Sequence, residues 1–427
     1  MLQRAINLCA DLHRKTHTMS RLYTLVVAAF SISLCLNAQD VVYDQLSMAP
    51  GYENMLFYSL ENGLVAEAPM AGWDLSFDIR PMGSTVNINC GMGHTLYPFG
   101  ALEEWDNASI EGWEPTDPYR NDHTSWSQGA FNQGNDPSDS FDLGWGIYDM
   151  ITHTVNTDRM YVLELPNGEY KKIAILSLVS GVYTFKYANM DGSEEIESTI
   201  DKSNYPGKLC AYYNLQNHET LDYEPSEAWD FIAMRYLDNI GGGVYYGVTG
   251  ILVNSGVNTH QKDGLFDPFS DGSYDPELLS DSTNAIGHDW KAYSMTSGYS
   301  VVDDRCYFVS DIPGNIWRVV FTDFEGMSTG NMELGKVLES TSAINQIQDL
   351  AFEIYPNPST FGSQVRVSLS NYNNVSIAIR TLAGSLIKTT NPTSLNPMID
   401  VSDIPCGAYF VECTDGKNRM AKKLIIQ

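Results

Sequence analysis

An internal duplication is the feature that most limits how this chain can fold. Tyr58-Ser59-Leu60, Pro69 and Trp73-Asp74-Leu75 return as Tyr213-Asn214-Leu215, Pro225 and Trp229-Asp230-Phe231, with spacings that differ by one residue. Further matches follow in one order: Trp145, Tyr148, Met150, Asp158-Arg159 and Tyr161 with Trp290, Tyr293, Met295, Asp304-Arg305 and Tyr307. The chain therefore contains two copies of one structural unit.

Both copies have the pattern of β-structure. Pro166-Asn167-Gly168 in the first copy matches Pro313-Gly314-Asn315 in the second, and both predict a turn between two strands. Tyr183, Phe185 and Tyr187 alternate with other residues at the period of a strand. We predict an all-β protein in which the matched aromatic residues, Trp73 and Trp229 among them, pack in the core. Asp74 and Asp230 are expected to form hydrogen bonds within the sheets.

The repeated motifs resemble those of the HmuY-like family of secreted, β-rich proteins. The resemblance rests on Trp73 to Phe77 and on Tyr161 to Lys172-Ile173, and the second copy departs from it at Ile232-Ala233 and Trp317-Arg318. It implies two tandem β-rich HmuY-like domains, residues 39–200 and 201–339. Founding members of that family capture haem, although a shared fold alone does not transfer the ligand.

Haem binding would need two axial side chains that converge on the iron. The loops offer five haem candidates, of which none aligns with the family's ligands: Met92, His94, His123, His260 and His288. The alternative is that these are ordinary loop residues.

The start of the chain resembles a signal peptide. Arg21 precedes an apolar run over residues 22–36, and Ala38 offers a small residue for cleavage. We expect residues 1–38 to be removed, with Met19 as an alternative start, and we expect no transmembrane span thereafter. Cys35 suggests a lipoprotein anchor as an alternative, but Leu34 before it is not small.

The charge of the chain excludes one class of partner. The leader holds four basic residues and one acidic residue, so the remaining chain carries 21 basic and 52 acidic residues and a net charge of −31. Such a surface repels nucleic acid phosphates, and we expect no nucleic acid partner. The five remaining cysteines are widely spaced and form no C-x-x-C pair, which gives no indication of a disulfide framework or a zinc site.

An acidic loop is the candidate metal site. Four aspartates at a spacing of four, Asp263, Asp267, Asp271 and Asp275, lie among glycines that favour turns. Clustered carboxylates on a flexible loop suit Ca²⁺. The alternative is a solvated acidic loop. Asp136, Asp139 and Asp142 form a weaker version of the pattern.

No catalytic motif stands out. The sequence contains no G-x-S-x-G, H-E-x-x-H or P-loop pattern, and Gly241-Gly242-Gly243 is better explained as a turn into the strand that follows. We therefore expect a protein that is not an enzyme. A hydrolase with a carboxylate pair hidden among the many acidic residues stays an alternative.

The last part of the chain predicts a small Ig-like β-sandwich. A polar linker over residues 340–349 leads to a strand that ends at Tyr355, where two prolines flank Asn357. Short alternating strands follow, including residues 409–413 and 424–426.

Residues 350–427 closely resemble the type A sorting domain of the type IX secretion system. The residues that carry the resemblance are Tyr355, Pro356, Asn357, Pro358, Gly384, Gly407, Tyr409, Lys422 and Lys423. The resemblance implies that the translocon and sorting machinery are partners, and that the protein passes through the periplasm to be released or held at the outer-membrane surface. A terminal domain used for adhesion is the alternative.

Together these patterns predict a non-enzymatic, secreted or cell-surface cargo that binds a small ligand such as haem or a surface glycan. A structural or adhesive surface protein without a small ligand is the first alternative. Neither haem nor Ca²⁺ is favoured as a cofactor, and the oligomeric state is open.

Overall fold

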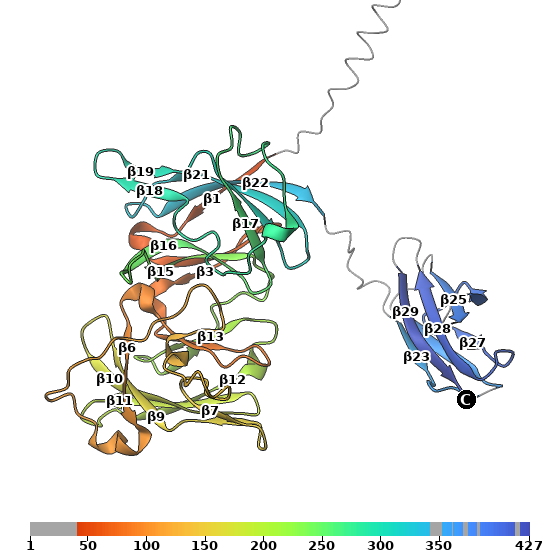
Figure 1. Ribbon diagram of the computed structural model, residues 1–427, viewed down its shortest axis with the longest axis horizontal. Helices are drawn as coiled ribbons and strands as arrows, with labels where there is room; N and C mark the ends of the chain where they lie inside the picture. The colour runs from red at the N-terminus through yellow and green to blue at the C-terminus, as the bar shows by residue number, and fades with distance from the viewer. Residues whose placement is uncertain (1–40, 342–351, 361, 370–374, 382–384, 415–418) are drawn as a thin grey trace, which may run out of the picture. The chain divides into compact units, whose positions relative to one another are not determined.

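The computed structural model describes residues 41–341, 352–360, 362–369, 375–381, 385–414 and 419–427 (Figure 1). The expected leader, most of the linker and Gly384 lie outside these residues. The described chain is built from β-strands and short 3-10 helices, which confirms the predicted all-β fold class. It forms a large unit within residues 1–309 and 317–339 and a small unit that includes residues 340–427.

In the described part of the large unit there are four sheets of four or more strands, which we name A to D. Sheet A has the order β1 (Val42–Ser47), β22 (Asn331–Ser340), β21 (Ile316–Phe324), β20 (Cys306–Ser310) and β17 (Asn258–Lys262). Sheet B has the order β16 (Tyr245–Val253), β15 (Phe231–Asn239), β2 (Asn54–Ser59) and β3 (Gly63–Pro69). Sheet C has the order β14 (Glu219–Leu221), β13 (Cys210–Asn214), β4 (Leu75–Asp78) and β5 (Val86–Ile88).

Sheet D is the largest of the four. It runs from β12 (Ile196–Asp201) through β11 (Val182–Asn189) to β10 (Tyr170–Val179). One end of β10 then pairs with β8 (Thr154–Asn156), which pairs with β7 (Ile147–Asp149). Its other end pairs with β9 (Arg159–Glu164), which pairs with β6 (Thr95–Ala101). A separate hairpin, β18 (Lys291–Ser294) with β19 (Gly298–Val301), follows Trp290.

The four sheets stack in the order A, B, C, D, because three apolar layers join them. Leu56 and Phe231 of sheet B pack with residues of sheet A, whereas Phe57 of sheet B packs with Tyr212 of sheet C. Leu75 of sheet C packs on sheet D. Sheets B and C are thus buried on both faces, which explains why β2 is apolar at successive positions instead of alternating.

The two sequence copies exchange strands. β2 and β3 come from the first copy, yet β2 pairs with β15 of the second copy. β13 and β14 come from the second copy, yet β13 pairs with β4 of the first. Sheets C and D form a first lobe from residues 75–221, and sheets A and B form a second lobe from residues 42–69 and 231–340. The sheets therefore do not follow the division expected between residues 200 and 201, which falls within β12, before its last residue, and separates most of that strand from β13 of the first lobe.

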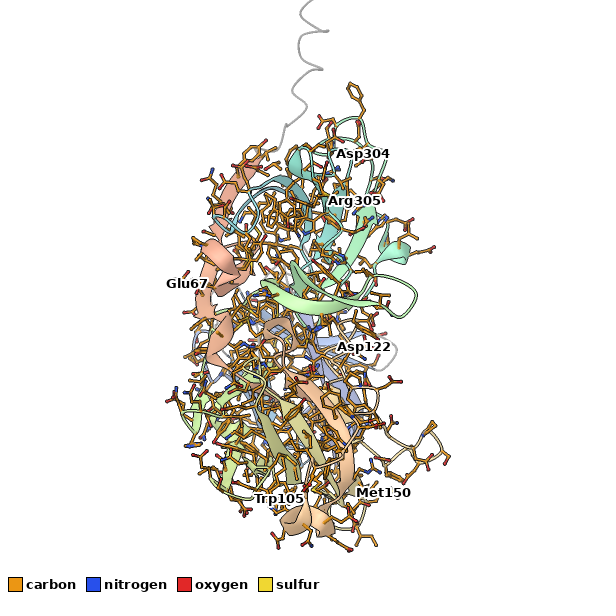
Figure 2. All side chains as sticks on the ribbon, turned by 90° about the vertical axis from the view of Figure 1, so that its left-hand side faces the viewer. Glu67, Trp105, Asp122, Met150, Asp304 and Arg305 are labelled. Carbon is orange, nitrogen blue, oxygen red and sulfur yellow. The ribbon has the colours of Figure 1, made fainter. Side chains whose placement is uncertain are left out.

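The two lobes follow one another along the large unit. Trp105 lies near one end of the unit and Arg305 near the other (Figure 2). Trp105 belongs to η4 (Leu102–Asn107), which covers the outer face of sheet D through contacts with Met160 and Ala174.

The repeated Trp-Asp motif holds the exchanged strands together. Trp73 and Trp229 are 4% and 3% exposed, which confirms their predicted burial. The Leu215 N–H donates to Asp74 Oδ2 and the Leu60 N–H donates to Asp230 Oδ2, both at 2.6 Å, so each aspartate binds the other copy. Two asparagines also play equivalent roles in the two copies. The Asn89 side-chain amide donates to the Trp73 carbonyl oxygen, and the Asn254 side-chain amide donates to the Trp229 carbonyl oxygen.

Replacement of Asp230 by alanine is expected to lower the free energy of unfolding by about 2 to 3 kcal/mol, because it leaves the buried Leu60 N–H without its charged acceptor. Chemical denaturation measures the loss. Asp303 is an exposed control, and Asp303→Ala is expected to stay within about 0.5 kcal/mol of the wild type. Equal midpoints for both variants would mean that the bond across the copies does not stabilise the fold.

Three repeated residues are exposed, and one of them, Tyr293, is a matched aromatic residue that was expected to pack in the core. Tyr293, Met150 and Met295 are 66%, 60% and 94% exposed. Tyr293 lies on β18, and Met150 and Met295 lie in the turns of the β7–β8 and β18–β19 hairpins. The repeat therefore preserves exposed hairpins as well as buried anchors.

The small unit is a β-sandwich, as predicted. One sheet has the order β23 (Phe352–Tyr355), β24 (Gln364–Leu369) and β27 (Met398–Asp400). The other has the order β26 (Leu386–Thr390), β25 (Ser376–Thr381), β28 (Gly407–Thr414) and β29 (Arg419–Ile426). Val367, Ile377 and Val411 contribute to the single core between them.

Candidate functional site

A groove in the second lobe is the best candidate for a ligand site. Its volume is about 670 Å³, within the range of roughly 300 to 1,000 Å³ that is typical of small-molecule pockets. It is formed by η1 (Pro50–Tyr52), the β15–β16 hairpin and the β18–β19 hairpin. Elements that lie far apart in the sequence therefore meet here, and we call this feature the tyrosine groove.

Basic side chains line the tyrosine groove. Lys291 Nζ donates to the Thr249 carbonyl oxygen at 2.6 Å and lies 4.1 Å from the centre of the Trp290 ring. Burial lowers the pKa of Lys291 to about 7, against the opposing influence of Asp289. The lysine therefore changes charge near neutral pH.

Arg235 and His288 are the other basic residues of the groove. Arg235 Nη1 lies 3.8 Å from Met92 Sδ, and His288 Nδ1 lies 3.3 Å from Asp238 Oδ2. Gly91 positions Met92, because η3 (Cys90–Met92) passes so close to β15 that a Cβ on Gly91 would lie 2.1 Å from the Arg235 carbonyl oxygen.

Tyrosine rings form the rest of the groove wall. Tyr293 and Tyr299 lie 5.0 Å apart between ring centres, and Tyr299 packs edge-on against Phe324 at 4.9 Å. Tyr246 is 63% exposed. Rings that are held on one side and open on the other provide flat apolar surfaces with a hydroxyl at the rim. The groove can therefore stack a ring and bind an anionic group at the same time.

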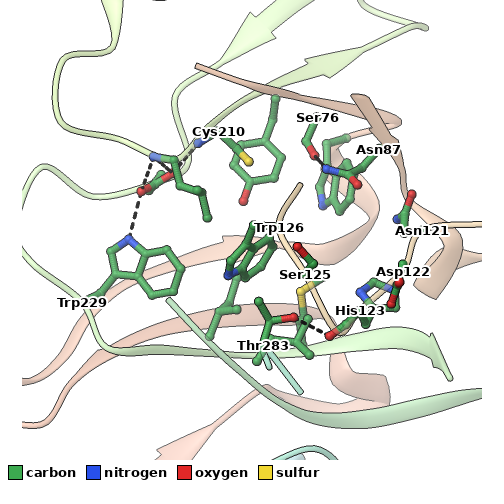
Figure 3. Close-up of a pocket in the computed structure, with 17 residues that line it drawn as sticks. Ser76, Asn87, Asn121, Asp122, His123, Ser125, Trp126, Cys210, Trp229 and Thr283 are labelled. Carbon is green, nitrogen blue, oxygen red and sulfur yellow. Dashed lines mark hydrogen bonds between the residues drawn. The ribbon is translucent and has the colours of Figure 1, made fainter. Parts of the chain in front are cut away.

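The interface between sheets B and C contains a second, smaller cavity (Figure 3). Trp73, Trp126 and Trp229 line it, and its volume is about 40 Å³, which is room for a few water molecules. The Trp229 indole N–H donates to Glu224 Oε1 at 3.0 Å, and burial raises the pKa of Glu224.

Trp73, the equivalent tryptophan in the first copy, does not form a hydrogen bond of this kind. Among the described residues, the Trp73 indole N–H has no hydrogen-bond partner. The position before the shared proline explains the difference, because Glu224 precedes Pro225 whereas Ala68 precedes Pro69. The cavity thus offers one free donor but too little space for a ligand of ordinary size.

The five haem candidates lie in different settings. His94 is buried, with Nδ1 3.0 Å from the Asn89 carbonyl oxygen and Nε2 2.7 Å from Asp74 Oδ1, so both ring nitrogens are occupied. Met92 lies beside Arg235. His123 lines the small cavity with Nε2 3.4 Å from Cys90 Sγ, and burial lowers its pKa to about 4.

His260 and His288 complete the set. His260 is 9% exposed with its ring 5.9 Å from that of Phe308, and its Nδ1 has no partner among the described residues. His288 lines the tyrosine groove. Haem binding stays a prediction, with His288 as the candidate that faces a space of suitable size.

The aspartates of the acidic loop each have a local role. Asp263 Oδ1 accepts from Arg305 Nε at 2.5 Å. Asp267 and Asp271 close a turn in which the Asp267 N–H donates to Asp271 Oδ2, and Asp275 Oδ1 accepts from the Glu277 N–H at the start of η7 (Pro276–Leu278). No group of three or more metal-ligating side chains that could hold an ion is found in the described part of the chain.

Calcium binding by this loop stays a prediction, and thermal melting with and without Ca²⁺ tests it. A cation held only by the folded loop would raise the melting temperature, and the increase would grow with concentration. Because the four carboxylates are engaged in separate hydrogen bonds, we expect a shift of less than about 1 °C. Asp263→Asn is the matched variant, since a larger shift that this change removes would establish a Ca²⁺ site.

The weaker acidic stretch is also held by local contacts. Asp142 forms an ion pair with Arg159 at 2.8 Å and accepts from the Asp136 N–H. This pairing recurs in the second copy, where Arg305 lies 3.0 Å from Asp289 Oδ2. The repeated Asp-Arg dipeptide thus anchors the loop before each shared tryptophan.

In the small unit, the Pro-Asn-Pro sequence holds the last strand. Asn357 Nδ2 donates to the Lys423 carbonyl oxygen at 2.6 Å, and Asn357 Oδ1 accepts from the Ile425 N–H at 3.0 Å. Pro356 and Pro358 flank this asparagine, and neither could donate to a strand itself. The side chain therefore replaces a backbone partner for β29.

The other residues of the expected sorting motif lie on the sandwich. Tyr409 donates from its hydroxyl to the Pro405 carbonyl oxygen at 2.7 Å, and Gly407 begins β28. Lys422 pairs with Glu353 at 2.5 Å, and Tyr355 is 75% exposed.

Apart from His288, which was a haem candidate, the basic and aromatic residues of the tyrosine groove were not singled out from the sequence as a ligand site. Arg235 lies on β15, far in sequence from the β18–β19 hairpin that carries Lys291 and Tyr299, and no short motif joins them. A comparison of the two copies position by position could have found the basic residues, because the equivalent positions of the first copy are not basic.

Comparisons with known proteins identify the tail. A family model, the secretion system C-terminal sorting domain, matches residues 353–427. No curated protein matches the chain. A solved structure of PorZ, a bacterial surface component of the type IX secretion system of Porphyromonas gingivalis, matches at 11% identity and a TM-score of 0.18. That match covers 66% of this chain and spans 41% of the PorZ chain.

No helix in the described residues is long and apolar enough to cross a membrane. The matched tail implies interaction with the type IX secretion machinery. The chain therefore carries a secretion system C-terminal sorting domain and is a cargo of the type IX secretion system, destined for the cell surface or the exterior.

Proposed function

We propose that the large unit is a non-enzymatic ligand-binding module, which the sorting domain delivers to the outside of the cell. The observation that carries this proposal is the tyrosine groove. Its volume suits a small ligand, and its basic and aromatic side chains can bind an anionic group and stack a ring. The β18–β19 hairpin that forms one wall holds its aromatic residues in the open, where core packing does not require them.

A melting experiment with a panel of ligands tests this proposal. A ligand that binds only the folded state stabilises it by about 2.7 kcal/mol at 100 times its dissociation constant, so a true ligand raises the melting temperature in proportion to the logarithm of its concentration. We expect at least one small anionic ligand to do so. A panel without any effect would favour a structural or adhesive surface protein.

Haem is the second candidate ligand, because His288 lines the groove and the repeats resemble the HmuY-like family. Adding haemin to the purified protein and recording the visible spectrum tests it. Binding through His288 would shift the Soret band, and His288→Leu would abolish the shift. Leucine is a suitable replacement because Leu143 occupies the equivalent position in the first copy.

A further inference from the structure

The two copies differ in charge at the positions that form the tyrosine groove. The shared tryptophans Trp73 and Trp229, and Trp145 and Trp290, fix the comparison. Counted from them, the equivalent pairs are Arg235 with Ile79, His288 with Leu143, and Lys291 with Gly146. Each basic residue of the groove thus corresponds to an apolar residue or glycine in a lobe built from the same repeat. The fold does not require basic residues at these positions.

Two of the groove's cations lack acidic partners. The chain has 53 acidic and 25 basic residues, and several of its basic side chains, such as Arg159 and Lys336, pair with a carboxylate. Within the described residues, however, Arg235 contacts Met92 Sδ and forms no ion pair, and the hydrogen bonds of Lys291 Nζ are to main-chain oxygens. A cation that is partly removed from water and not paired costs stability. A bound anion would remove that cost.

The charge of the whole molecule limits what kind of anion can enter. With a net charge of −28, the protein repels polyanions at a distance. His288 is already beside Asp238, which leaves Arg235 and Lys291 as the two cations to meet a ligand. These two favour one carboxylate group over a chain of phosphates or a nucleic acid.

The tyrosines define the rest of the ligand. Tyr246, Tyr293 and Tyr299 are 63%, 66% and 39% exposed and line the same groove as the two cations. A pyranose ring has an apolar face of C–H groups that packs on an aromatic ring, and its hydroxyls can bond to the tyrosine hydroxyls at the rim. A ring with one carboxylate therefore matches both parts of the groove.

We propose that the tyrosine groove binds an acidic carbohydrate, a pyranose that carries a single carboxylate, with the carboxylate on Arg235 and Lys291 and the ring on the tyrosines. This inference rests on the proposed binding function and names its ligand class.

Isothermal titration of the full chain tests the ligand class. The probes are glucuronic acid, galacturonic acid and N-acetylneuraminic acid, with galactose as the neutral control and inorganic phosphate as the simple anion. We expect at least one acidic sugar to bind at least tenfold more tightly than galactose and phosphate. Affinity equal to that of galactose, or no binding by any acidic sugar, would overturn the proposal. In that case, a shift of the Soret band on adding haemin, or binding of a neutral sugar in the groove, would still support the broader proposal that the large unit binds a small ligand.

Two variants locate the site. Arg235→Ile copies the first repeat, and Lys291→Met keeps the length of the side chain without its charge. Each is expected to weaken binding of the acidic sugar at least tenfold and to leave the melting temperature within a few degrees of the wild type. Lys186→Met, on β11 above the Trp105 ring, removes one charge from the other lobe and should not change the affinity. Unchanged affinity in both groove variants would refute the assignment of these residues.

Discussion

Deletion of residues 353–427 is expected to abolish delivery of the protein to the cell surface and the medium. The family model for the sorting domain matches this segment, and the small unit has its own core, so its removal leaves the apolar layers of the large unit intact. The truncated protein should fold and accumulate inside the outer membrane. Surface labelling of intact cells, followed by fractionation, measures the distribution.

Two controls make this prediction specific. Lys186→Met in the full chain retains the tail and should reach the surface at the level of the wild type. A fluorescent protein that carries a leader and residues 340–427 should be exported by the tail alone. Surface delivery of the truncated chain at normal levels would show that the address lies elsewhere.

The exchange of strands predicts which fragments fold. Residues 70–224 include both β4 and β13 and all of sheets C and D, whereas residues 39–200 contain β4 without β13 and β2 without β15. We expect the first fragment to give a cooperative melting transition and a β-type circular dichroism spectrum. The second fragment is expected to give neither, because two of its sheets lack half of their strands.

The fragment 70–224 exposes the face of sheet C that carries Trp73 and Tyr212, so we expect the fragment to be less soluble than the full chain. If the fragment aggregates, replacing Tyr212 by a polar residue tests whether the aggregation comes from this exposed apolar face or from misfolding. Cooperative melting of residues 39–200 would contradict the exchange and support folding of each copy by itself.

The buried anchors were predictable from the sequence, whereas the pairing of strands was not. Trp73 and Trp229 are bulky apolar residues that recur at nearly equal spacing in the two copies, and such residues are usually buried. Strand pairing depends on partners far along the chain, and a repeat offers two equivalent partners for each strand. The continuous apolar run of β2 does not distinguish β4 from β15 as its neighbour.

The candidate site was less accessible to sequence reasoning for a related reason. His94 looked like a loop ligand, but its ring is held by Asp74 and by the Asn89 carbonyl oxygen, and neither contact leaves a local pattern. Lys291 and Arg235 are 56 positions apart and meet only because the two hairpins converge. The small β-sandwich was predicted more fully, because its short strands are separated by turns with recognisable residues.

The pairing of β1 with β22 brings the first and last strands of the large unit side by side in sheet A. Proteases are common outside a cell, and exposed loop tips are where they cut. A single cut in a loop such as residues 263–277 would separate the polypeptide into two pieces, but both pieces would still contribute strands to sheet A, because β1 and β17 precede the cut and β20 to β22 follow it. Because the two copies are interlocked, the two fragments of a molecule cut once in such a loop are expected to stay associated and to keep the tyrosine groove intact.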